Sequence, residues 1–257
     1  MRLLRSAMSQ FPEMLKTWRK ARRFSQLDLA LEADVSSRHI SFLETGRAQP
    51  SRDMVTRLGD ALHLPLATRN QMLTQAGFAV RYHGRDWDEE AMAPIRDALE
   101  HALTGHEPYP AFAVDRLWTV VRMNAPARNL FGMLGIVEGG NLLDLATSDL
   151  LPAHIENWPE VAHHTAQRLR TESAAQGGVP ELDRAANVLA SIPGSGEIQH
   201  SPVVPTIYKA GETRLSLFST IAQFGTPVDL TLDELKIEMF FPADEASRQV
   251  LVALAGG

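Results

Sequence analysis

The stretch DVSSRHISFLETGR, residues 34–47, carries the signals that begin and end a short helix. Ser36 and Ser37 are suitable N-cap residues, because a serine hydroxyl can accept a hydrogen bond from a free backbone N–H at a helix start. Gly46 follows the segment, and glycine takes the left-handed C-cap conformation at little cost. The pattern therefore predicts a helix from about Ser37 to Glu44.

This predicted helix has one apolar face and one polar face. Ile40 and Leu43 lie three residues apart, so they share the face that we expect to be buried. The opposite face combines two hydroxyls, a cation and an aromatic ring, which are not typical of a core. These residues are Ser37, Arg38, Ser41 and Phe42. Taken alone, such a face is most often only solvated.

The segment before this helix changes that interpretation. Residues 25–33, SQLDLALEA, predict another short helix, in which Ser25 and Asp28 have the spacing of a capping box. Asp34 and Val35 join the two helices in a very short turn. Two short helices with a tight turn, the second with a polar outer face, are typical of a helix-turn-helix. The second helix would fit the major groove of DNA, which is about 12 Å wide.

Three further helices are predicted close to this pair. Their apolar residues recur at helical spacing over residues 10–22, 51–64 and 66–77. Five short helices in so short a segment predict a compact, mainly α domain over residues 1–76.

The run from Ser25 to Ser51 resembles the phage-repressor-like helix-turn-helix family, also called the XRE family. The matching positions are Ser25-Gln26, Ala30, Val35-Ser36, Ile40-Ser41, Leu43-Glu44, Gly46-Arg47 and Pro50-Ser51. The resemblance implies that this domain binds a double-stranded DNA operator, and that an ion pair joins Arg19 to Glu44.

The same resemblance implies individual roles in DNA binding. Gln26 would contact a phosphate and Arg47 would approach the DNA backbone. Phe42 departs from the polar residue common at its position, so apolar contact, such as with a thymine methyl group, would replace a hydrogen bond there. The candidate DNA-binding residues are Gln26, Ser36, Ser37, Arg38, His39, Phe42 and Arg47.

The charge is unevenly distributed along the chain. Residues 1–57 contain eleven Lys or Arg and six acidic residues, which gives a net charge of +5. Because the whole chain carries −6, residues 58–257 carry −11. A basic segment on an acidic body is expected when only one end of a protein meets phosphates.

Composition excludes several classes of protein. The chain has no cysteine, so it has no disulfide or thiolate nucleophile. It has no apolar run of the roughly 20 residues that cross a bilayer, and no signal-peptide pattern, so we expect a cytoplasmic protein that does not enter the membrane. It lacks the glycine-rich nucleotide motifs, the nucleophile elbow and a histidine cluster. We therefore expect no catalytic residues, no metal site and no enzyme.

A different architecture follows the helical domain. Helical periodicity is lost over residues 77–90, which we interpret as a linker to a second domain over residues 91–257. A helix at 90–106 comes first, then a hairpin over 110–124 with a turn at Asp115-Arg116. The later elements are a mainly helical block at 141–190, strands at 203–211, 213–225 and 234–244, with a hairpin turn at Gly211-Glu212, and a closing helix.

Two strands, a helical block and three strands are the order of a PAS-like α+β domain. Such a domain has a five-stranded antiparallel sheet with helices over one face. Several strings are also similar to the ligand-binding domain of MmyB-like regulators. They are Trp118, Val120 and Asn124 in one motif, Leu130-Phe131, NWPEVAHH at 157–164, and the run 220–244. This resemblance implies a transcription regulator whose sensor has an apolar cavity, occupied by a fatty acid in at least one relative.

The apolar strand faces and nearby helices supply candidate ligand-binding residues. They are Phe112, Val114, Trp118, Asn124, Leu130, Phe131, His163, Leu169, Phe218, Thr220 and Phe240. Each of these alone is more often a plain core residue than part of a pocket, and Asn124 is more often a helix cap. A bound fatty acid would be an effector, and no cofactor is expected.

The sequence favours the first of three functions. The first is a homodimeric DNA-binding regulator that senses a small apolar ligand. The second is a DNA-binding regulator whose C-terminal domain serves only dimerisation or binding of a protein partner. The third is an antitoxin-like repressor that works without a ligand.

Overall fold

The computed structural model describes residues 10–194, 203–211, 213–225 and 229–255. These residues form two compact units, and the chain passes from the first to the second between Gly84 and Arg85. That point lies within the segment interpreted as a linker.

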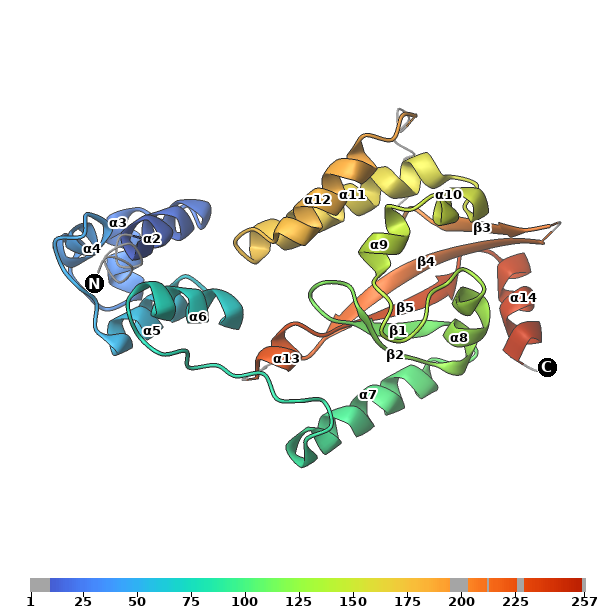
Figure 1. Cartoon of the computed structure of the whole chain (residues 1–257), viewed down its shortest axis with the longest axis horizontal. Helices are drawn as coiled ribbons and strands as arrows, with labels where there is room; N and C mark the ends of the chain where they lie inside the picture. Colours follow the sequence, from blue (N-terminus) through green and yellow to red (C-terminus); the bar gives the residue numbers. More distant parts are fainter. Residues whose placement is uncertain (1–9, 195–202, 212, 226–228, 256–257) are drawn as a thin grey trace. The chain divides into compact units, whose positions relative to one another are not determined.

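The first unit is a bundle of five short helices, as predicted. Their bounds are α2 Gln10–Ala21, α3 Gln26–Glu32, α4 Ser37–Glu44, α5 Arg52–Ala61 and α6 Leu66–Gln75 (Figure 1). The apolar side chains that repeat at helical spacing meet in one core, in which Leu15, Ile40 and Leu43 are fully buried. The helix pair α3 and α4 is thereby fixed against α2.

Serine side chains begin three of these helices. The Ser25 hydroxyl accepts from the Asp28 backbone N–H at 3.1 Å, while the Asp28 carboxylate accepts from the Ser25 N–H at 2.8 Å, which completes the predicted capping box. The N-cap of α4 is Ser36, whose hydroxyl accepts from the His39 N–H at 3.2 Å. Ser37, the other serine that the sequence offered, is the first residue of the helix. A capping hydroxyl of this kind contributes about 1 kcal/mol.

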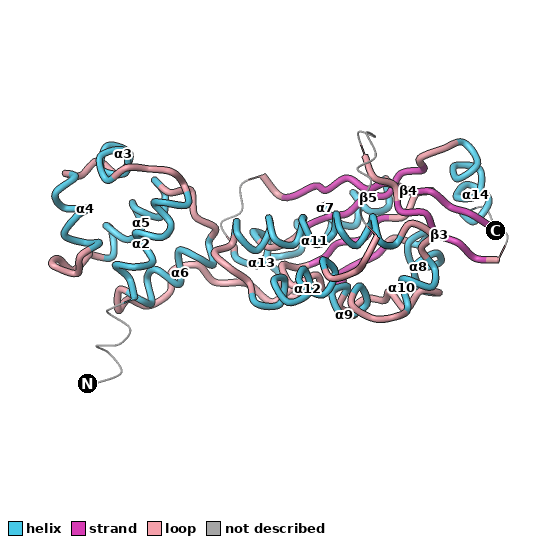
Figure 2. Tube along the Cα trace, turned by 90° about the horizontal axis from the view of Figure 1, so that it is seen from above, coloured by secondary structure: helices cyan, strands magenta, loops and turns pink. Residues whose placement is uncertain are grey.

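The second unit contains a five-stranded sheet in which every pair of neighbours is antiparallel. The strand order is β2-β1-β5-β4-β3. The bounds are β1 Ala111–Val114, β2 Val120–Met123, β3 Thr206–Ala210, β4 Thr213–Gln223 and β5 Lys236–Pro242. Figure 2 draws the strands in magenta. The PAS-like α+β architecture expected from the sequence is therefore present.

Helices pack on both faces of the sheet, and not on one face as we expected. Along β1 the side chains alternate in direction, as in any strand. Ala111 and Ala113 pack with Leu99 and Leu103 of α7 (Ala93–Gly105), which follows a short 3-10 turn at Glu90–Met92. Phe112 and Val114 face the opposite side. There the chain places α8 Ala125–Gly132, α9 Leu142–Ala146, α10 Leu150–His154, α11 Trp158–Ala175 and α12 Pro180–Ala190 (Figure 1).

Two further helices complete the unit. They are α13 Leu230–Asp233 and the closing helix α14 Glu245–Ala255. The predicted hairpin turn after β3 includes Glu212, which lies outside the described residues.

The first hairpin differs from the prediction in its turn. Trp118 was expected within a strand, but β2 begins only at Val120. The Asp115 carboxylate accepts from the backbone N–H groups of Leu117 and Thr119 at 2.9 and 2.8 Å, which stabilises a longer loop. Trp118 lies in this loop with φ of +64°, a conformation that is uncommon for a bulky side chain.

The segment 77–90 contacts both units. Phe78 packs against the core of the first unit. In the first unit, the Asn70 side chain donates to the Tyr82 carbonyl at 2.6 Å and accepts from the Arg81 and Tyr82 N–H groups. In the second unit, Trp87 packs against the cluster formed by α7 and the sheet. The predicted bounds of the linker remain a prediction.

Candidate functional site

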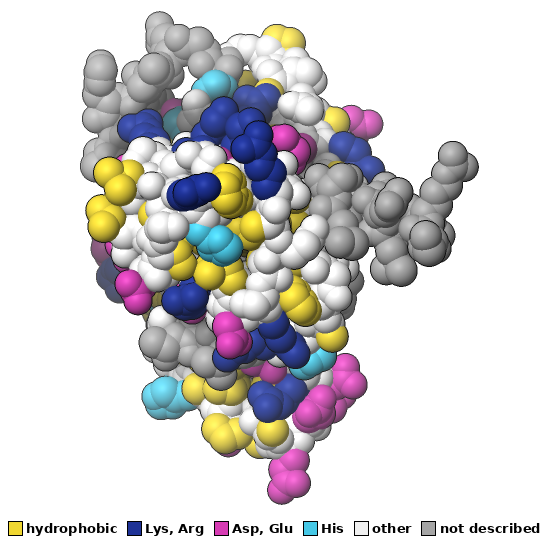
Figure 3. All heavy atoms as spheres, turned by 90° about the vertical axis from the view of Figure 1, so that its left-hand side faces the viewer, with side chains coloured by type: hydrophobic (Ala, Val, Ile, Leu, Met, Phe, Trp, Pro, Cys, Tyr) yellow, Lys and Arg dark blue, Asp and Glu magenta, His cyan; other side chains and the backbone are white. Residues whose placement is uncertain are grey.

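The first candidate site is the outer face of α4. Ser37 and Arg38 are exposed on α4, and His39 and Phe42 are half-buried. Ser36 and Arg47 are exposed just before and just after the helix. Figure 3 views the side of the first unit that carries α3 and α4, with Lys and Arg side chains spread over it in several groups. The face is thus available to a partner and carries positive charge.

Arg38 and Phe42 act as a pair on this face. They are four residues apart, and the Arg38 guanidinium lies 5.2 Å from the centre of the Phe42 ring. Such a cation–π contact limits the conformations of an otherwise flexible side chain. Phe42 is half-buried, so part of its ring is held by the protein while the rest is exposed and contacts Arg38.

Below this face lies the ion pair implied by the repressor resemblance. Arg19 donates from Nε to Glu44 Oε1 at 2.5 Å and from Nη2 to Oε2 at 3.0 Å, and both side chains are largely buried. Arg19 Nη1 also donates to the Phe24 carbonyl at 2.7 Å. The predicted pair is confirmed, and it joins α2 to the end of α4.

Gln26 has a partner that the sequence did not suggest. Its side-chain amide donates to Glu44 Oε2 at 2.8 Å, and the side chain is half-buried. An amide nitrogen carries two hydrogens, so this bond uses only one of them. Burial alone would raise the pKa of Glu44, but the hydrogen bonds from Arg19 and Gln26 and the Arg19 charge outweigh it and lower that pKa.

The second candidate site is a cavity of about 250 Å³ inside the second unit. Strands of the sheet form one wall, and α9, α10 and α11 contribute side chains to the other. Five of the eleven predicted ligand-binding residues line it, namely Phe112, Trp118, Phe131, Phe218 and Phe240. Aromatic edges contact one another on this wall, with 4.9 Å between the ring centres of Phe131 and Phe240.

Three predicted lining residues belong instead to packed core or to another surface. Val114 and Leu169 are fully buried in separate core clusters, where close packing leaves them no free surface. Leu130 faces the hollow beside α14, together with Met133 and Leu254. Their apolar character was correctly read, but it does not distinguish a core residue from a cavity residue.

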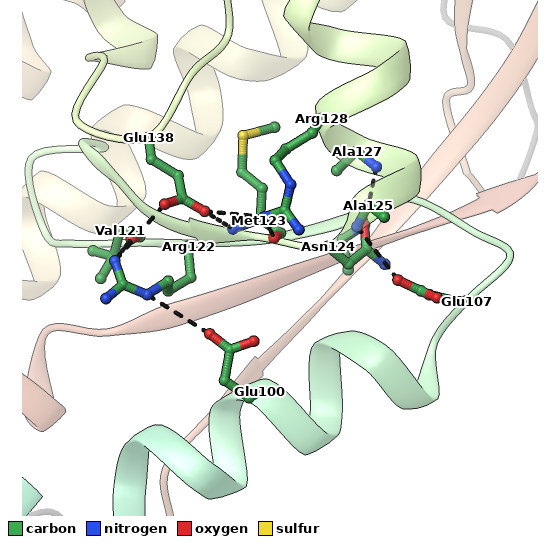
Figure 4. Close-up of polar contacts among 11 residues, drawn as sticks. Glu100, Glu107, Val121, Arg122, Met123, Asn124, Ala125, Ala127, Arg128 and Glu138 are labelled. Atoms are coloured by element: carbon green, nitrogen blue, oxygen red, sulfur yellow. Dashed lines mark hydrogen bonds and ion pairs between the residues drawn. The ribbon is translucent and has the colours of Figure 1, made fainter. Parts of the chain in front are cut away.

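Asn124 is a structural residue and does not line the cavity. Its carboxamide oxygen accepts from the N–H groups of Ala127 and Ala111 at 3.0 Å each. Its nitrogen donates to the carbonyls of Leu103 and Tyr109 at 3.1 and 2.8 Å. Figure 4 shows Asn124 at the start of α8, in a region where salt bridges also join neighbouring elements. Every hydrogen-bonding group of this side chain is therefore used within the fold.

Thr220 and His163 do not line this cavity either. Thr220 is exposed and points to the face of β4 opposite to Leu217 and Ser219, which line the cavity. Phe218 shares the face of Thr220 and stacks on Phe241, but it also reaches the cavity. His163 contacts Gln167 on the outside of α11, with 2.9 Å between their side-chain nitrogens. The adjacent His164 lines the cavity instead, since neighbouring residues on a helix point in different directions.

Sequence reasoning missed a cluster of four charged residues at the cavity. Arg168 pairs with Glu172 and Glu238 at 3.0 Å each, and Lys236 pairs with Glu172 at 2.5 Å. The Ser219 hydroxyl donates to Glu238 at 2.7 Å. Two signals were present in the sequence. Arg168 and Glu172 have salt-bridge spacing on a helix, and Lys236 and Glu238 alternate within an apolar strand.

Trp118 joins this cluster to the cavity wall. Its indole N–H donates to Glu172 at 3.0 Å, and the Arg168 guanidinium lies 4.3 Å from its ring centre. Lys236 lies 5.0 Å from the same ring. The left-handed backbone of Trp118 places its ring against Arg168, Glu172 and Lys236. The contacts with these side chains offset the cost of that backbone conformation.

The charges of the cluster support one another. Burial alone would raise the pKa of Glu172, but Lys236 and Arg168 outweigh it and lower that pKa. Burial would lower the pKa of Arg168, but Glu238 and Glu172 raise it. Burial raises the pKa of Tyr208, which also lines the cavity, so its phenol is neutral.

Comparison with known proteins agrees with the two units. Residues 95–254 match the family model described as the MmyB-like transcription regulator ligand binding domain. Residues 10–72 match the model described as a helix-turn-helix domain. No curated protein matches the chain. No helix among the described residues is long and apolar enough to cross a membrane.

Proposed function

The chain belongs to the family of MmyB-like transcription regulators, and from this premise we propose that it binds a specific DNA operator through α4 and senses a small apolar ligand in the cavity of its second unit. The operator would be read by the exposed face of the helix, and the ligand would change the affinity for DNA. A fatty acid is one candidate ligand. The expectation of a cytoplasmic protein follows from a role on DNA and remains a prediction.

The observation that carries the proposal is the cavity itself. It lies in the unit that matches a ligand-binding domain, and most of its lining is aromatic or aliphatic. Ligand sites in proteins are typically concave and apolar with a few polar groups, which describes this cavity. Its volume lies below the usual range for such sites, so we expect a small or slender ligand.

The DNA-binding half of the proposal is supported by α4. An exposed arginine held over an aromatic ring can reach a base edge in the major groove, and arginine most often contacts guanine. We further propose a homodimer, because helix-turn-helix regulators commonly read two half-sites about 34 Å apart. The alternative is that the second unit serves only dimerisation or a protein partner.

A variant that fills the cavity tests the ligand half. Ala146 is a small residue on the cavity wall, so Ala146→Phe should abolish retention of the ligand. The matched control is Thr220→Trp, an exposed position on the opposite face of the sheet, which should retain it. The measurement is mass spectrometry of organic extracts from each purified protein, with the melting temperature as a check of folding.

The results separate the alternatives. A wild-type protein that carries no small molecule, and gains no thermal stability from any apolar probe, would favour the dimerisation alternative. Ligand that is retained equally by folded Ala146→Phe and by Thr220→Trp would place the site elsewhere in the chain.

A further inference from the structure

We propose that the ligand is uncharged, with an apolar body and one hydrogen-bond-accepting oxygen, such as an ester carbonyl or an alcohol, and that Nη2 of Arg168 is the donor to this oxygen. The inference rests on the proposed function, because it takes the cavity as the ligand site. It goes further in assigning the polar end of the ligand and its charge, and it excludes the ionised form of the fatty acid named above as one candidate.

The first observation is the unused half of the Arg168 guanidinium. Nε donates to Glu172 and Nη1 donates to Glu238, both at 3.0 Å. Nη2 is buried, and it has no hydrogen-bond partner in the part of the chain that the structure describes. Arg168 lines the cavity. A buried donor without a partner is costly, so an acceptor supplied by a ligand would be bound favourably at this position.

The second observation is that the cluster around Arg168 is already neutral. Arg168 and Lys236 contribute two positive charges, and the three ion pairs connect them to Glu172 and Glu238. A carboxylate ligand at Nη2 would bring a third anion next to Glu238, which itself lines the cavity. It would also lose its hydration without gaining an unpaired cation, which is unfavourable. A neutral oxygen avoids both effects.

The third observation is the composition of the remaining wall. Side chains such as Phe112, Phe131, Leu145 and Ile155 form much of the remaining wall, although Thr165, Thr206 and Tyr208 also line it. The apolar side chains offer no hydrogen bond, so the part of the ligand beside them is apolar. Burial of an apolar chain there is favourable in proportion to the area removed from water. His164 also lines the cavity, but its side chain is exposed and remains hydrated.

The test compares probes with the same carbon chain and different ends. Binding of 1-decanol, methyl decanoate, decanoate and decane to the full chain is measured by calorimetry near neutral pH. We expect the alcohol and the ester to bind about tenfold or more tightly than decane, because each accepts a hydrogen bond from a charged donor. We expect decanoate to bind more weakly than the alcohol.

A variant isolates the donor. Arg168→Lys keeps a positive charge near Glu172 and Glu238 but removes Nη2, so the preference for the alcohol and the ester over decane should be lost while decane binding stays unchanged. The matched control is Arg170→Lys, an exposed position two residues further along α11, which should behave as wild type. If Arg168→Lys does not fold, the comparison of the four probes on the wild-type protein tests the inference by itself.

The outcomes distinguish this inference from the proposed function. Tighter binding of decanoate than of 1-decanol would overturn the inference and leave the ligand-sensing function in place. Equal binding of 1-decanol and decane would show that Nη2 contacts only water. No binding of any probe to the wild-type protein, which also carries no co-purified molecule, would instead remove the proposed function.

Discussion

At the scale of single residues, Glu44 links several helices of the first unit. It receives hydrogen bonds from two other helices, through Arg19 of α2 and Gln26 of α3, while it closes α4 itself. One carboxylate therefore holds together three of the five helices in the first unit. The same contact orients Gln26, which we expect to reach a DNA phosphate, so stability and DNA binding share this residue.

Removing the Glu44 carboxylate should destabilise the first unit strongly. Glu44→Ala leaves Arg19 buried and unpaired, and loss of one partner from a buried pair costs about 3–5 kcal/mol. Glu32→Ala, on the exposed face of α3, should have little effect and serves as the control. The measurement is denaturant unfolding followed by circular dichroism. Equal effects of the two substitutions would exclude a stabilising role for the pair.

The pair should also make stability depend on pH in the acid range. The pKa of Glu44 is lowered in the folded state, so its contribution is complete above the ordinary carboxyl value of about 4.3 and is lost as pH falls through the folded value. The difference in unfolding free energy between wild type and Glu44→Ala should therefore shrink on acidification. A difference that is constant down to the acid transition would contradict this assignment.

At the scale of elements, α4 combines a buried and an exposed role within eight residues. Ile40 and Leu43 fix the helix in the core, and the Arg38 and Phe42 pair lies on its outer surface. Since the buried face is rigid, the exposed pair is presented in a defined direction. This is the arrangement that a helix needs if side chains are to meet particular base pairs.

Replacing Arg38 should change the sequence preference of DNA binding. We expect Arg38→Ala to lose about 1–3 kcal/mol of discrimination at one base pair. Gln26→Ala should weaken binding to all sequences alike, because a phosphate contact carries no base information. Binding selection on a randomised DNA pool, followed by affinity measurement, separates these effects. An unchanged preference and affinity for Arg38→Ala would rule out α4 as the recognition helix.

At the scale of the whole molecule, charge separates the two functions along the chain. Residues 1–57 carry +5, whereas residues 58–257 carry −11. DNA affinity should therefore fall steeply with added salt, as counterions released from DNA compete with the basic groups. Binding of an uncharged ligand in the second unit should be almost insensitive to salt. Regulation requires that the ligand bind two states of the protein with different affinity.

The salt dependence of DNA binding gives a whole-molecule test. Arg47→Ala should reduce the slope of log affinity against log salt by about 1, since one phosphate contact is lost. Arg184→Ala, an exposed residue of α12 in the second unit, should leave the slope unchanged. Affinities are measured by fluorescence anisotropy over a range of salt concentrations. If Arg184→Ala reduced the slope and Arg47→Ala did not, the phosphate contacts would lie in the second unit, which would contradict this prediction.

Local sequence determined the first unit almost completely. Capping serines, the short turn at Asp34 and apolar residues at helical spacing act over a few residues, so they can be read before the chain is folded. The same holds for Asn124, whose cap of α8 the pattern favoured. The order of strands and helices in the second unit was also visible, because turns and alternation are local.

Only the tertiary structure decided which residues surround the cavity. Alternation shows that Ser219 and Thr220 point to opposite faces of β4, but the inner face depends on which helices pack there. The charged cluster joins α11 to β5 across 70 residues, from Arg168 to Glu238. Each segment carries charged residues at a recognisable spacing, but neither shows which other segment it will pair with. That Nη2 of Arg168 lacks a partner is known only once the strand register has brought Lys236 and Glu238 close to Arg168. Hydrogen bonds between distant segments depend on how the segments pack, and not on spacing along the chain.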